Sequence, residues 1–206
     1  MSEDQILAVI REVLDGDVNA FEEIVREYEK TVYNLALRMS GDQEDALDIS
    51  QEAFIKVYGS LRSFRGESKF SVWLYRIVSN TCLDFLRKRS RRAEESLSAE
   101  DGEGEPQERE IRDERYAPEG MLERKLAREA LQRGLLALSE EQRKILLLRE
   151  LQGFSYEEIG RILSLESGTV KSRIFRARKK LCECLAEDGN ISLPFSSAKT
   201  EGGETT

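Results

Sequence analysis

This chain of 206 residues has no histidine and only three cysteines. The lack of histidine excludes the common zinc sites that combine cysteine and histidine ligands. Cys82, Cys182 and Cys184 follow no disulfide spacing, and so few cysteines fit a reducing, cytoplasmic compartment. A phosphate-binding loop and a nucleophile–base pair are also missing. We therefore expect a protein that is not an enzyme and that holds no metal and no cofactor.

Long hydrophobic runs and alternating strand patterns are missing as well. No apolar stretch is long enough to cross a membrane and no signal peptide is present, so we expect no membrane insertion. Aromatic residues make up 7% of the chain and prolines number three, whereas charged residues make up 35%. With apolar residues at helical spacing, this composition predicts an all-α protein whose helices have long polar faces.

The most informative stretch is FSYEEIGRILSLESGTVKSRIFRARKKL, residues 154–181, which predicts two short helices joined by a tight turn. Ser155 and Glu158 can form a capping box at the first helix, and Ser167 is a candidate N-cap for the second. Upstream, Ser139 and Gln142 can form another capping box. The second helix is basic on every side except one apolar stripe. A solvated basic helix in a bundle is one interpretation. The first helix as a support, the tight turn and the capping residues together favour a second interpretation, in which the basic helix inserts into the DNA major groove.

The overall charge opposes that interpretation unless the positive charge is local. The formal net charge of the chain is −8, and a uniformly acidic protein is repelled by DNA phosphates. We therefore expect weak binding of DNA by the free protein unless a partner assists.

Acidic side chains gather on one outer face of a helix predicted over residues 42–60. Asp48 and Glu52 lie there beside Gln51 and Phe54. Nothing apolar surrounds the carboxylates to raise their pKa, so acid–base catalysis is disfavoured. A solvated face is the default interpretation, and a docking face is the alternative because Phe54 and Ile55 are hydrophobic neighbours of the acids.

Two neighbouring segments point to unpaired nucleic acid. Phe64 and Arg65 lie on a predicted loop, residues 61–68, where they could hold a base, although core packing is the favoured interpretation of Phe64 alone. Residues 70–92 predict a helix in which five of the six residues from Arg87 are basic. Basic residues at a helix C-terminus interact favourably with the helix dipole, but five basic residues are more than this interaction requires. Aromatic residues beside them favour single strands or melted duplex.

The composition divides the chain into two helical domains, residues 1–92 and 121–186. Residues 93–120 between them are acidic, rich in glycine and proline, and poor in large apolar residues, which predicts a flexible linker. This linker could lie in a positively charged channel or act only as a solubilising spacer. Residues 187–206 predict a disordered tail. We expect no fixed spacing between the two domains in the free protein.

Together these motifs resemble a bacterial RNA polymerase sigma factor of the extracytoplasmic-function (ECF) group of the sigma-70 family. The resemblance covers residues 5–186. It is carried by DISQEAFIKVY (48–58), FSVWLYRIVSNTCLDFLRKR (70–89) and SYEEIGRILSLESGTVKSRIFRARKKL (155–181). A stand-alone helix-turn-helix regulator is the alternative, but it leaves the second motif unexplained. A non-DNA adaptor protein is a third possibility, and an enzyme is the least favoured.

The resemblance implies promoter-specific initiation, with roles for particular residues. Docking on the clamp helices of the largest polymerase subunit would involve Asp48, Gln51, Glu52 and Phe54. Recognition and melting of the −10 element would involve Phe64, Arg65, Trp73, Tyr75, Arg76, Ser79, Asn80, Asp84, Arg87 and Lys88. Recognition of the −35 element would involve Ser167, Thr169, Lys171, Ser172, Arg173, Phe175, Arg176 and Arg178. The implied partners are core RNA polymerase, including its flap region, promoter DNA and an anti-sigma factor.

One position departs from the family pattern. Many members carry glycine near position 164, where this chain has Ser164. We expect serine to be tolerated there if it keeps a right-handed conformation. The resemblance implies no role for the polar tail or for the pair Cys182 and Cys184.

Overall fold

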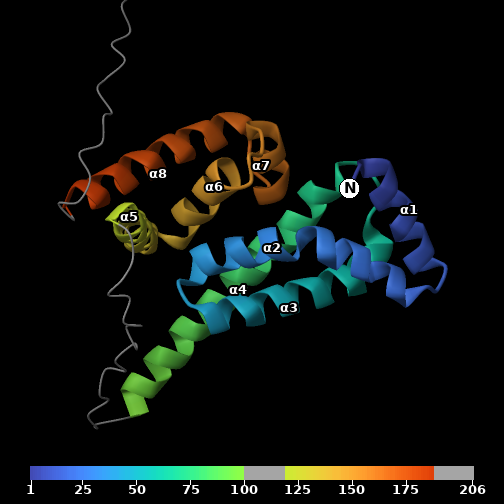
Figure 1. Cartoon of the computed structure of the whole chain (residues 1–206), viewed down its shortest axis with the longest axis horizontal. Helices are drawn as coiled ribbons and strands as arrows, with labels where there is room; N and C mark the ends of the chain where they lie inside the picture. The colour runs from blue at the N-terminus through green and yellow to red at the C-terminus, as the bar shows by residue number, and fades with distance from the viewer. Residues whose placement is uncertain (100–118, 188–206) are drawn as a thin grey trace, which may run out of the picture.

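The computed structural model describes residues 1–99 and 119–187, and every regular element in these two ranges is helical (Figure 1). The prediction of an all-α protein is therefore confirmed. Most of the predicted linker and nearly all of the predicted tail, residues 100–118 and 188–206, lie outside the described residues. Within the described ranges, no helix has the length and apolar character that crossing a membrane requires.

The N-terminal module places three helices around one core and adds α1 at one end (Figure 1). Gly41, in the left-handed conformation, ends α2, and the Asp42 side chain caps α3, so the chain reverses direction in two residues. Helix α4 packs across the α2–α3 pair. The elements are α1 (Glu3–Leu14), η1 (Val18–Ala20), α2 (Phe21–Ser40), α3 (Gln43–Ser60), η2 (Leu61–Ser63) and α4 (Phe70–Ala99).

In the C-terminal module, α8 packs against the three other helices. Two predicted capping boxes are present, Ser139 with Gln142 at α6 and Ser155 with Glu158 at α7. Residues 145–148 of α6 are all buried, as its nearly continuous apolar sequence predicts. The elements are α5 (Glu119–Leu136), α6 (Glu140–Glu150), α7 (Tyr156–Leu163) and α8 (Ser167–Glu187).

Several helix boundaries differ from the sequence prediction. Helix α4 continues to Ala99, so the first part of the predicted linker is helical. Helix α8 begins at Ser167 itself, and the Val170 amide donates to the Glu166 carbonyl at 3.0 Å. Ser167 therefore lies in the first turn and does not occupy the cap position that the sequence suggested.

The turn between α7 and α8 corrects a further expectation. Ser164 is left-handed, with φ 55° and ψ 49°, not right-handed, and no other described non-glycine residue has positive φ. This conformation lets the amides of Ser164 and Leu165 both donate to the Gly160 carbonyl, which closes the end of α7. A Cβ on Gly160 would lie 2.7 Å from the Leu165 carbonyl oxygen. The absence of a side chain at Gly160 therefore leaves room for the Leu165 carbonyl in the turn.

Replacing Ser164 with glycine should stabilise the fold by about 1 kcal/mol. A left-handed conformation costs a residue with a Cβ roughly 1–2 kcal/mol, and glycine's freedom in the unfolded chain offsets part of that gain. Thermal unfolding should show a midpoint about 2–4 °C higher. Ser90→Gly, in the exposed right-handed helix α4, is the control and should lower the midpoint. A lower midpoint for Ser164→Gly would contradict this account of the turn.

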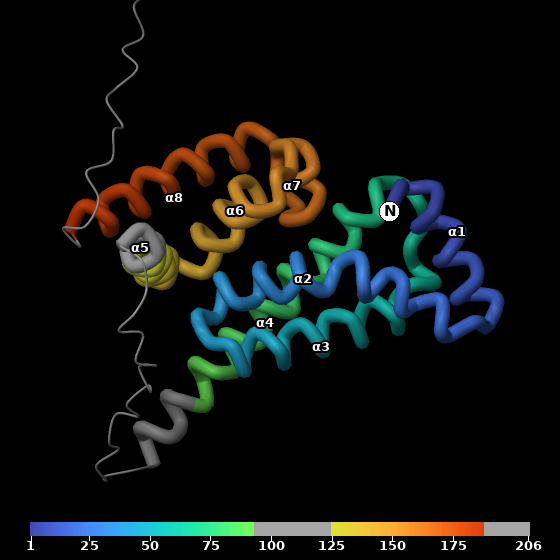
Figure 2. The backbone as a smooth tube through the Cα atoms, viewed as in Figure 1, coloured from blue at the N-terminus to red at the C-terminus, as the bar shows by residue number. Residues whose placement is uncertain are grey.

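The two modules pack against each other, contrary to the expectation that nothing sets their spacing. Helix α7 lies along α4, while α5 and α6 contact α2 (Figures 1 and 2). Buried side chains of both modules form one continuous cluster. Leu136 sits so close to Gly41 that a Cβ there would lie 2.7 Å from its Cδ1 atom. The apolar faces of α2 and α4 are therefore shared between two modules.

Candidate nucleic-acid interface

Helix α8 turns one face inward and presents a basic face to solvent. Val170, Ile174 and Ala177 are each no more than 1% exposed. Helical spacing then places an exposed set on the opposite side. This outward face consists of Ser172, Phe175, Arg176 and Lys179. Phe175 is 68% exposed among these polar and basic side chains. Lys179 was missing from the predicted set, although its helical spacing could have identified it.

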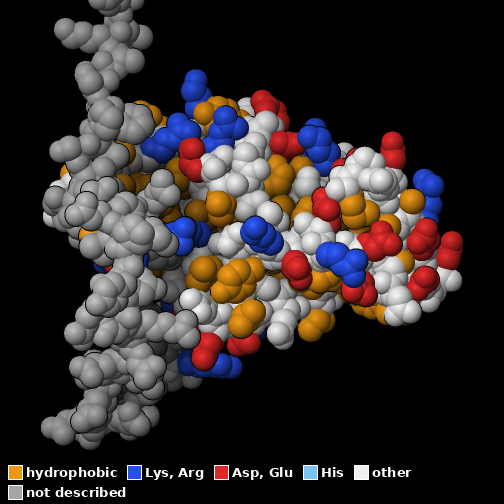
Figure 3. Space-filling model, viewed as in Figure 1, with side chains coloured by type: hydrophobic (Ala, Val, Ile, Leu, Met, Phe, Trp, Pro, Cys, Tyr) orange, Lys and Arg blue, Asp and Glu red, His pale blue; other side chains and the backbone are white. Residues whose placement is uncertain are grey.

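Charge is unevenly distributed on the face of the molecule that Figure 3 shows. Lysine and arginine side chains gather over α8, whereas aspartate and glutamate gather toward the α1 end (Figure 3). The net charge of −8 is therefore compatible with a locally basic surface.

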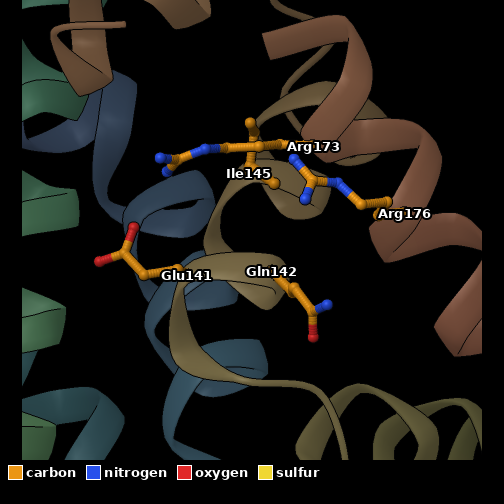
Figure 4. Close-up of a pocket in the computed structure, with 5 residues that line it drawn as sticks. All are labelled: Glu141, Gln142, Ile145, Arg173 and Arg176. Atoms are coloured by element: carbon orange, nitrogen blue, oxygen red, sulfur yellow. The ribbon is translucent and has the colours of Figure 1, made fainter. Parts of the chain in front are cut away.

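Not every predicted residue of α8 belongs to that outward face. Arg178 donates from Nε to the Glu150 carboxylate at 2.9 Å, so this cation already has a partner. Arg173 lies beside the outward face and, together with Arg176 of that face, reaches over a hollow of about 280 Å³. Helix α6 supplies the other wall through Glu141, Gln142 and Ile145 (Figure 4). Ser167 and Lys171 are exposed near the start of the helix, and Thr169 is half-buried.

One stripe of α4 is open to solvent. Arg76, Asn80 and Asp84 follow at intervals of four residues, and Arg87 continues the line, so these exposed side chains share one face. Lys88 is exposed beside them. The stripe combines cations, which suit phosphates, with an amide, which suits base edges.

The aromatic residues at the start of α4 are mainly structural. The Phe64 ring lies 5.4 Å from the ring of Phe70 and 5.4 Å from that of Trp73. Both Phe64 and Trp73 are half-buried. Packing of Phe64 into the core is thus the observed arrangement, whereas Arg65 next to it is exposed on the loop.

Two predicted residues of the −10 set are buried. Tyr75 is 3% exposed, and its ring lies 5.2 Å from that of Phe154 in the C-terminal module. Burial raises the pKa of Tyr75 to about 12. Ser79 is 1% exposed, and its hydroxyl has no hydrogen-bond partner in the described part of the chain. In this arrangement, neither side chain can contact nucleic acid.

The acidic face of α3 contains Ile55, as predicted, together with two further exposed apolar residues. Asp48 and Gln51 are exposed as expected, and Phe54 packs partly against the core. Leu47, Ile55 and Tyr58 are 52%, 71% and 42% exposed. Their positions in the helix place them on the same side as Asp48 and Gln51. The same helical spacing, applied to the apolar residues left over from the core stripe, could have identified Leu47 and Tyr58, which the prediction did not include.

Glu52 lies at the edge of this face and is already paired. Its carboxylate lies 2.7 Å from Lys56 Nζ. That hydrogen bond holds the pKa of Glu52 below its usual range, against the opposing effect of burial. The carboxylate is thus a charged rim group.

Comparison with known proteins assigns the chain to a family. Residues 24–92 match Sigma-70 region 2, and residues 128–181 match Sigma-70, region 4. The ECF RNA polymerase sigma-E factor of Escherichia coli K12 is 41% identical over 184 residues, which cover 86% of this chain and 92% of that protein. The chain belongs to the ECF group of the sigma-70 family. The RNA polymerase sigma-H factor of Pseudomonas aeruginosa is 37% identical over 186 residues, covering 90% of this sigma factor and 96% of that one.

Solved structures agree with this assignment. Bartonella quintana RpoE, crystallised with the anti-sigma factor NepR, has a TM-score of 0.62 and 27% identity, with 82% of this sigma factor and 98% of RpoE covered. CnrH, solved with the cytosolic domain of CnrY, shares the fold at a TM-score of 0.64 over 91% of this chain and 99% of that one.

The family assignment explains both helical modules of this ECF sigma factor. It is a promoter-directing factor for RNA polymerase, with region 2 in α2–α4 and region 4 in α5–α8. A stand-alone helix-turn-helix regulator is not favoured, because the region 2 match accounts for the segment that such a regulator leaves unexplained.

Proposed function

We propose that this sigma factor divides promoter-specific initiation among three separate surfaces. Helix α3 docks on core RNA polymerase, the open stripe of α4 with the adjacent loop reads the −10 element, and α8 reads the −35 element. The observation that supports this division most directly is the position of three exposed faces of different chemistry on three helices. One is apolar with acids, one mixes cations with an amide, and one is basic with an exposed aromatic ring.

The α3 face has the composition of a docking surface. Leu47, Ile55 and Tyr58 form its apolar centre, with Asp48 and Gln51 beside them. A desolvated apolar centre with a polar rim is the usual anatomy of a protein interface. We assign this face to the clamp helices of the largest polymerase subunit.

The α4 stripe suits melted DNA. Asn80 can hydrogen-bond to a base edge, while Arg76 and Arg87 neutralise phosphates. Arg65, exposed on the preceding loop, can hold an unstacked base by stacking its guanidinium plane on it. Capturing bases offsets the cost of unstacking, which is about a few kcal/mol.

The α8 face suits the major groove of duplex DNA. Arg176 lies at its centre and can donate two hydrogen bonds to guanine, while Lys171 and Lys179 contact phosphates. Core polymerase, which supplies catalysis, holds regions 2 and 4 at one spacing and so raises their effective concentration at a matching promoter. We place the factor in the cytoplasm, assign a further contact to the flap region, and expect an anti-sigma partner by analogy with the RpoE–NepR complex.

Run-off transcription with purified core polymerase over a promoter library tests this function. The chain should select a subset of promoters, and Arg176→Ala should reduce their use roughly 5- to 100-fold, because a bidentate contact to guanine contributes about 1–3 kcal/mol. Arg11→Ala, an exposed arginine on α1, is the control and should have little effect. If the chain selects no promoters, the proposed function is wrong. If Arg176→Ala leaves selection unchanged, the α8 assignment is wrong.

A further inference from the structure

Helix α4 begins without a side-chain cap from its own segment. The first amides of a helix have no partner within the helix, and the helix N-terminus carries partial positive charge. Lys69 occupies the cap position, and its side chain offers hydrogen-bond donors only. The Ser68 hydroxyl donates to the Lys69 carbonyl at 3.3 Å, and residues 70–73 include no acidic residue. The oxygen acceptor that usually serves a helix start is therefore missing from the local sequence.

Glu3 in α1 supplies this acceptor. The Phe70 amide, the first of α4, donates to Glu3 Oε1 at 2.6 Å, although 67 residues separate the two. Hydrogen bonds from a backbone amide to a carboxylate are short and roughly twice as strong as those between neutral groups. The negative charge also compensates the positive end of the helix dipole. Glu3 thus caps α4 from another helix.

Helix α1 is anchored at the place where it provides this cap. Ser2 and Gln5 form a capping box at its start, and Ile6 and Val9 in the next turns are each at most 5% exposed. Glu3 itself is half-buried. Figure 1 shows the start of α1 beside the start of α4. The position of the carboxylate therefore follows from the packing of α1 in the core.

The capped turn ends the loop to which we assign capture of an unstacked base. This loop, residues 64–69, joins η2 to α4 and exposes Arg65. At its start, η2 contacts α1 as well, and the Phe64 ring lies 5.4 Å from that of Phe70 at its end. Gly66, with φ 71°, lets the chain turn between these points. Helix α1 thus holds both ends of the loop.

The Glu3 charge also lies close to the aromatic residues beneath the loop. The Tyr28 ring in α2 lies 5.8 Å from that of Phe70. Burial, followed by the charges of Glu3 and Glu27, raises the pKa of Tyr28 to about 12, so its hydroxyl remains neutral. The carboxylate of Glu3 therefore faces a partly buried environment, where a hydrogen bond to the Phe70 amide is less exposed to competition from water.

We propose that Glu3 is a positioning residue for −10 recognition: its carboxylate fixes the first turn of α4 and thereby the loop that presents Arg65 to an unstacked base. The inference rests on the proposed role of this loop at the −10 element. Glu3 precedes the residues that match Sigma-70 region 2, 24–92, so the match assigns it no role. A loop already held in its binding conformation loses less conformational freedom when it binds a base, and capture is correspondingly tighter.

Amide hydrogen exchange in the free, full-length chain, followed by NMR, tests the cap. Glu3→Ala should speed exchange of the Phe70 amide about fivefold or more, the size expected for loss of a helix cap. Glu3→Gln keeps an oxygen acceptor without the charge and should have an intermediate effect. Asp4→Ala is the matched control, because Asp4 is an exposed acid in the same turn of α1. Unchanged exchange in Glu3→Ala, or an equal rise in Asp4→Ala, would overturn the cap.

Run-off transcription with core polymerase tests the positioning. On promoters that the wild-type chain selects, each −10 base is replaced in turn, and Arg65→Ala identifies the position that the loop contacts. Glu3→Ala should reduce the preference for the favoured base at that same position about fivefold or more. It should lose less activity on a template whose −10 element is already unpaired, because capture then no longer has to offset unstacking. Glu3→Gln should restore part of the preference.

A general loss of folded protein would give a different result. It would lower transcription by one factor at every −10 base and on both templates, and that outcome would overturn the positioning role. Loss of preference confined to positions that Arg65→Ala does not affect would overturn it as well. If wild-type protein directs no transcription, the proposed function fails, whereas the exchange rates still decide whether Glu3 caps α4.

Discussion

Replacing Ile55 with aspartate should weaken the association of this sigma factor with core RNA polymerase about 100-fold or more. Ile55 is 71% exposed on α3 and lies between Leu47 and Tyr58 in the apolar centre of the proposed docking face. Central residues dominate interface energies, commonly by about 2 kcal/mol or more each. Placing a carboxylate there adds a desolvation penalty, because the interface that buries it offers an apolar environment. The two effects together correspond to roughly 3 kcal/mol.

A fluorescence titration of labelled factor with core polymerase measures this loss. Val18→Asp is a matched control, because Val18 is 58% exposed on η1, away from α3. Both variants should keep the wild-type unfolding midpoint, since exposed substitutions usually change stability by about 0.5 kcal/mol or less. Asp48→Arg with Glu52→Arg should weaken binding independently by reversing the charge of the rim. Wild-type affinity in both the apolar and the charge variants would rule out α3 as the docking face.

Replacing Arg143 with methionine should lower the free energy of unfolding by about 3–5 kcal/mol, because breaking a buried charged network leaves unpaired polar groups. Arg143 is 7% exposed. It donates to the carbonyls of Leu135, Leu136 and Leu138 at 2.8, 3.0 and 3.2 Å, and also to that of Met39. These carbonyls lie at or near the ends of α5 and α2, where helices leave acceptors without partners. Methionine fills similar volume but supplies no donor.

Urea unfolding followed by circular dichroism measures this change. Arg143→Lys retains the charge but loses the planar fork of donors, so its midpoint should fall between those of wild type and Arg143→Met. Arg161→Met, an exposed arginine on α7, is the control and should stay close to wild type. A midpoint for Arg143→Met within experimental error of wild type would show that the carbonyls find other partners.

The capping boxes illustrate what could be predicted from sequence. Ser139 with Gln142, and Ser155 with Glu158, form as expected because each box depends on four consecutive residues. Arg143 illustrates the opposite case. It lies beside an apolar run in α6 and looks like a solvated cation, yet the carbonyls that hold it come from α5 and α2. No local pattern identifies acceptors supplied by another module.

The α4 residues predicted to contact the −10 element show the same contrast between what the sequence predicts and what it does not. Arg76 and Asn80 are exposed as expected, whereas Tyr75 and Ser79 are covered. Spacing along α4 places these pairs on different stripes, but it does not say that Phe154 lies over one of them. Ser164 is a smaller example, because its left-handed conformation follows from how α7 and α8 meet and not from any preference of serine.

The sequence by itself determined the helices, most of their caps, the basic face of α8 and the membership of the sigma-70 family. These depend on interactions within a few residues or on motifs carried by the chain. Only the tertiary structure decided that region 4 rests on region 2, that Arg143 joins the two, and that Tyr75 and Ser79 are hidden. The physical reason is that burial is set by whichever surfaces meet, and an apolar stripe looks the same in sequence whichever partner covers it.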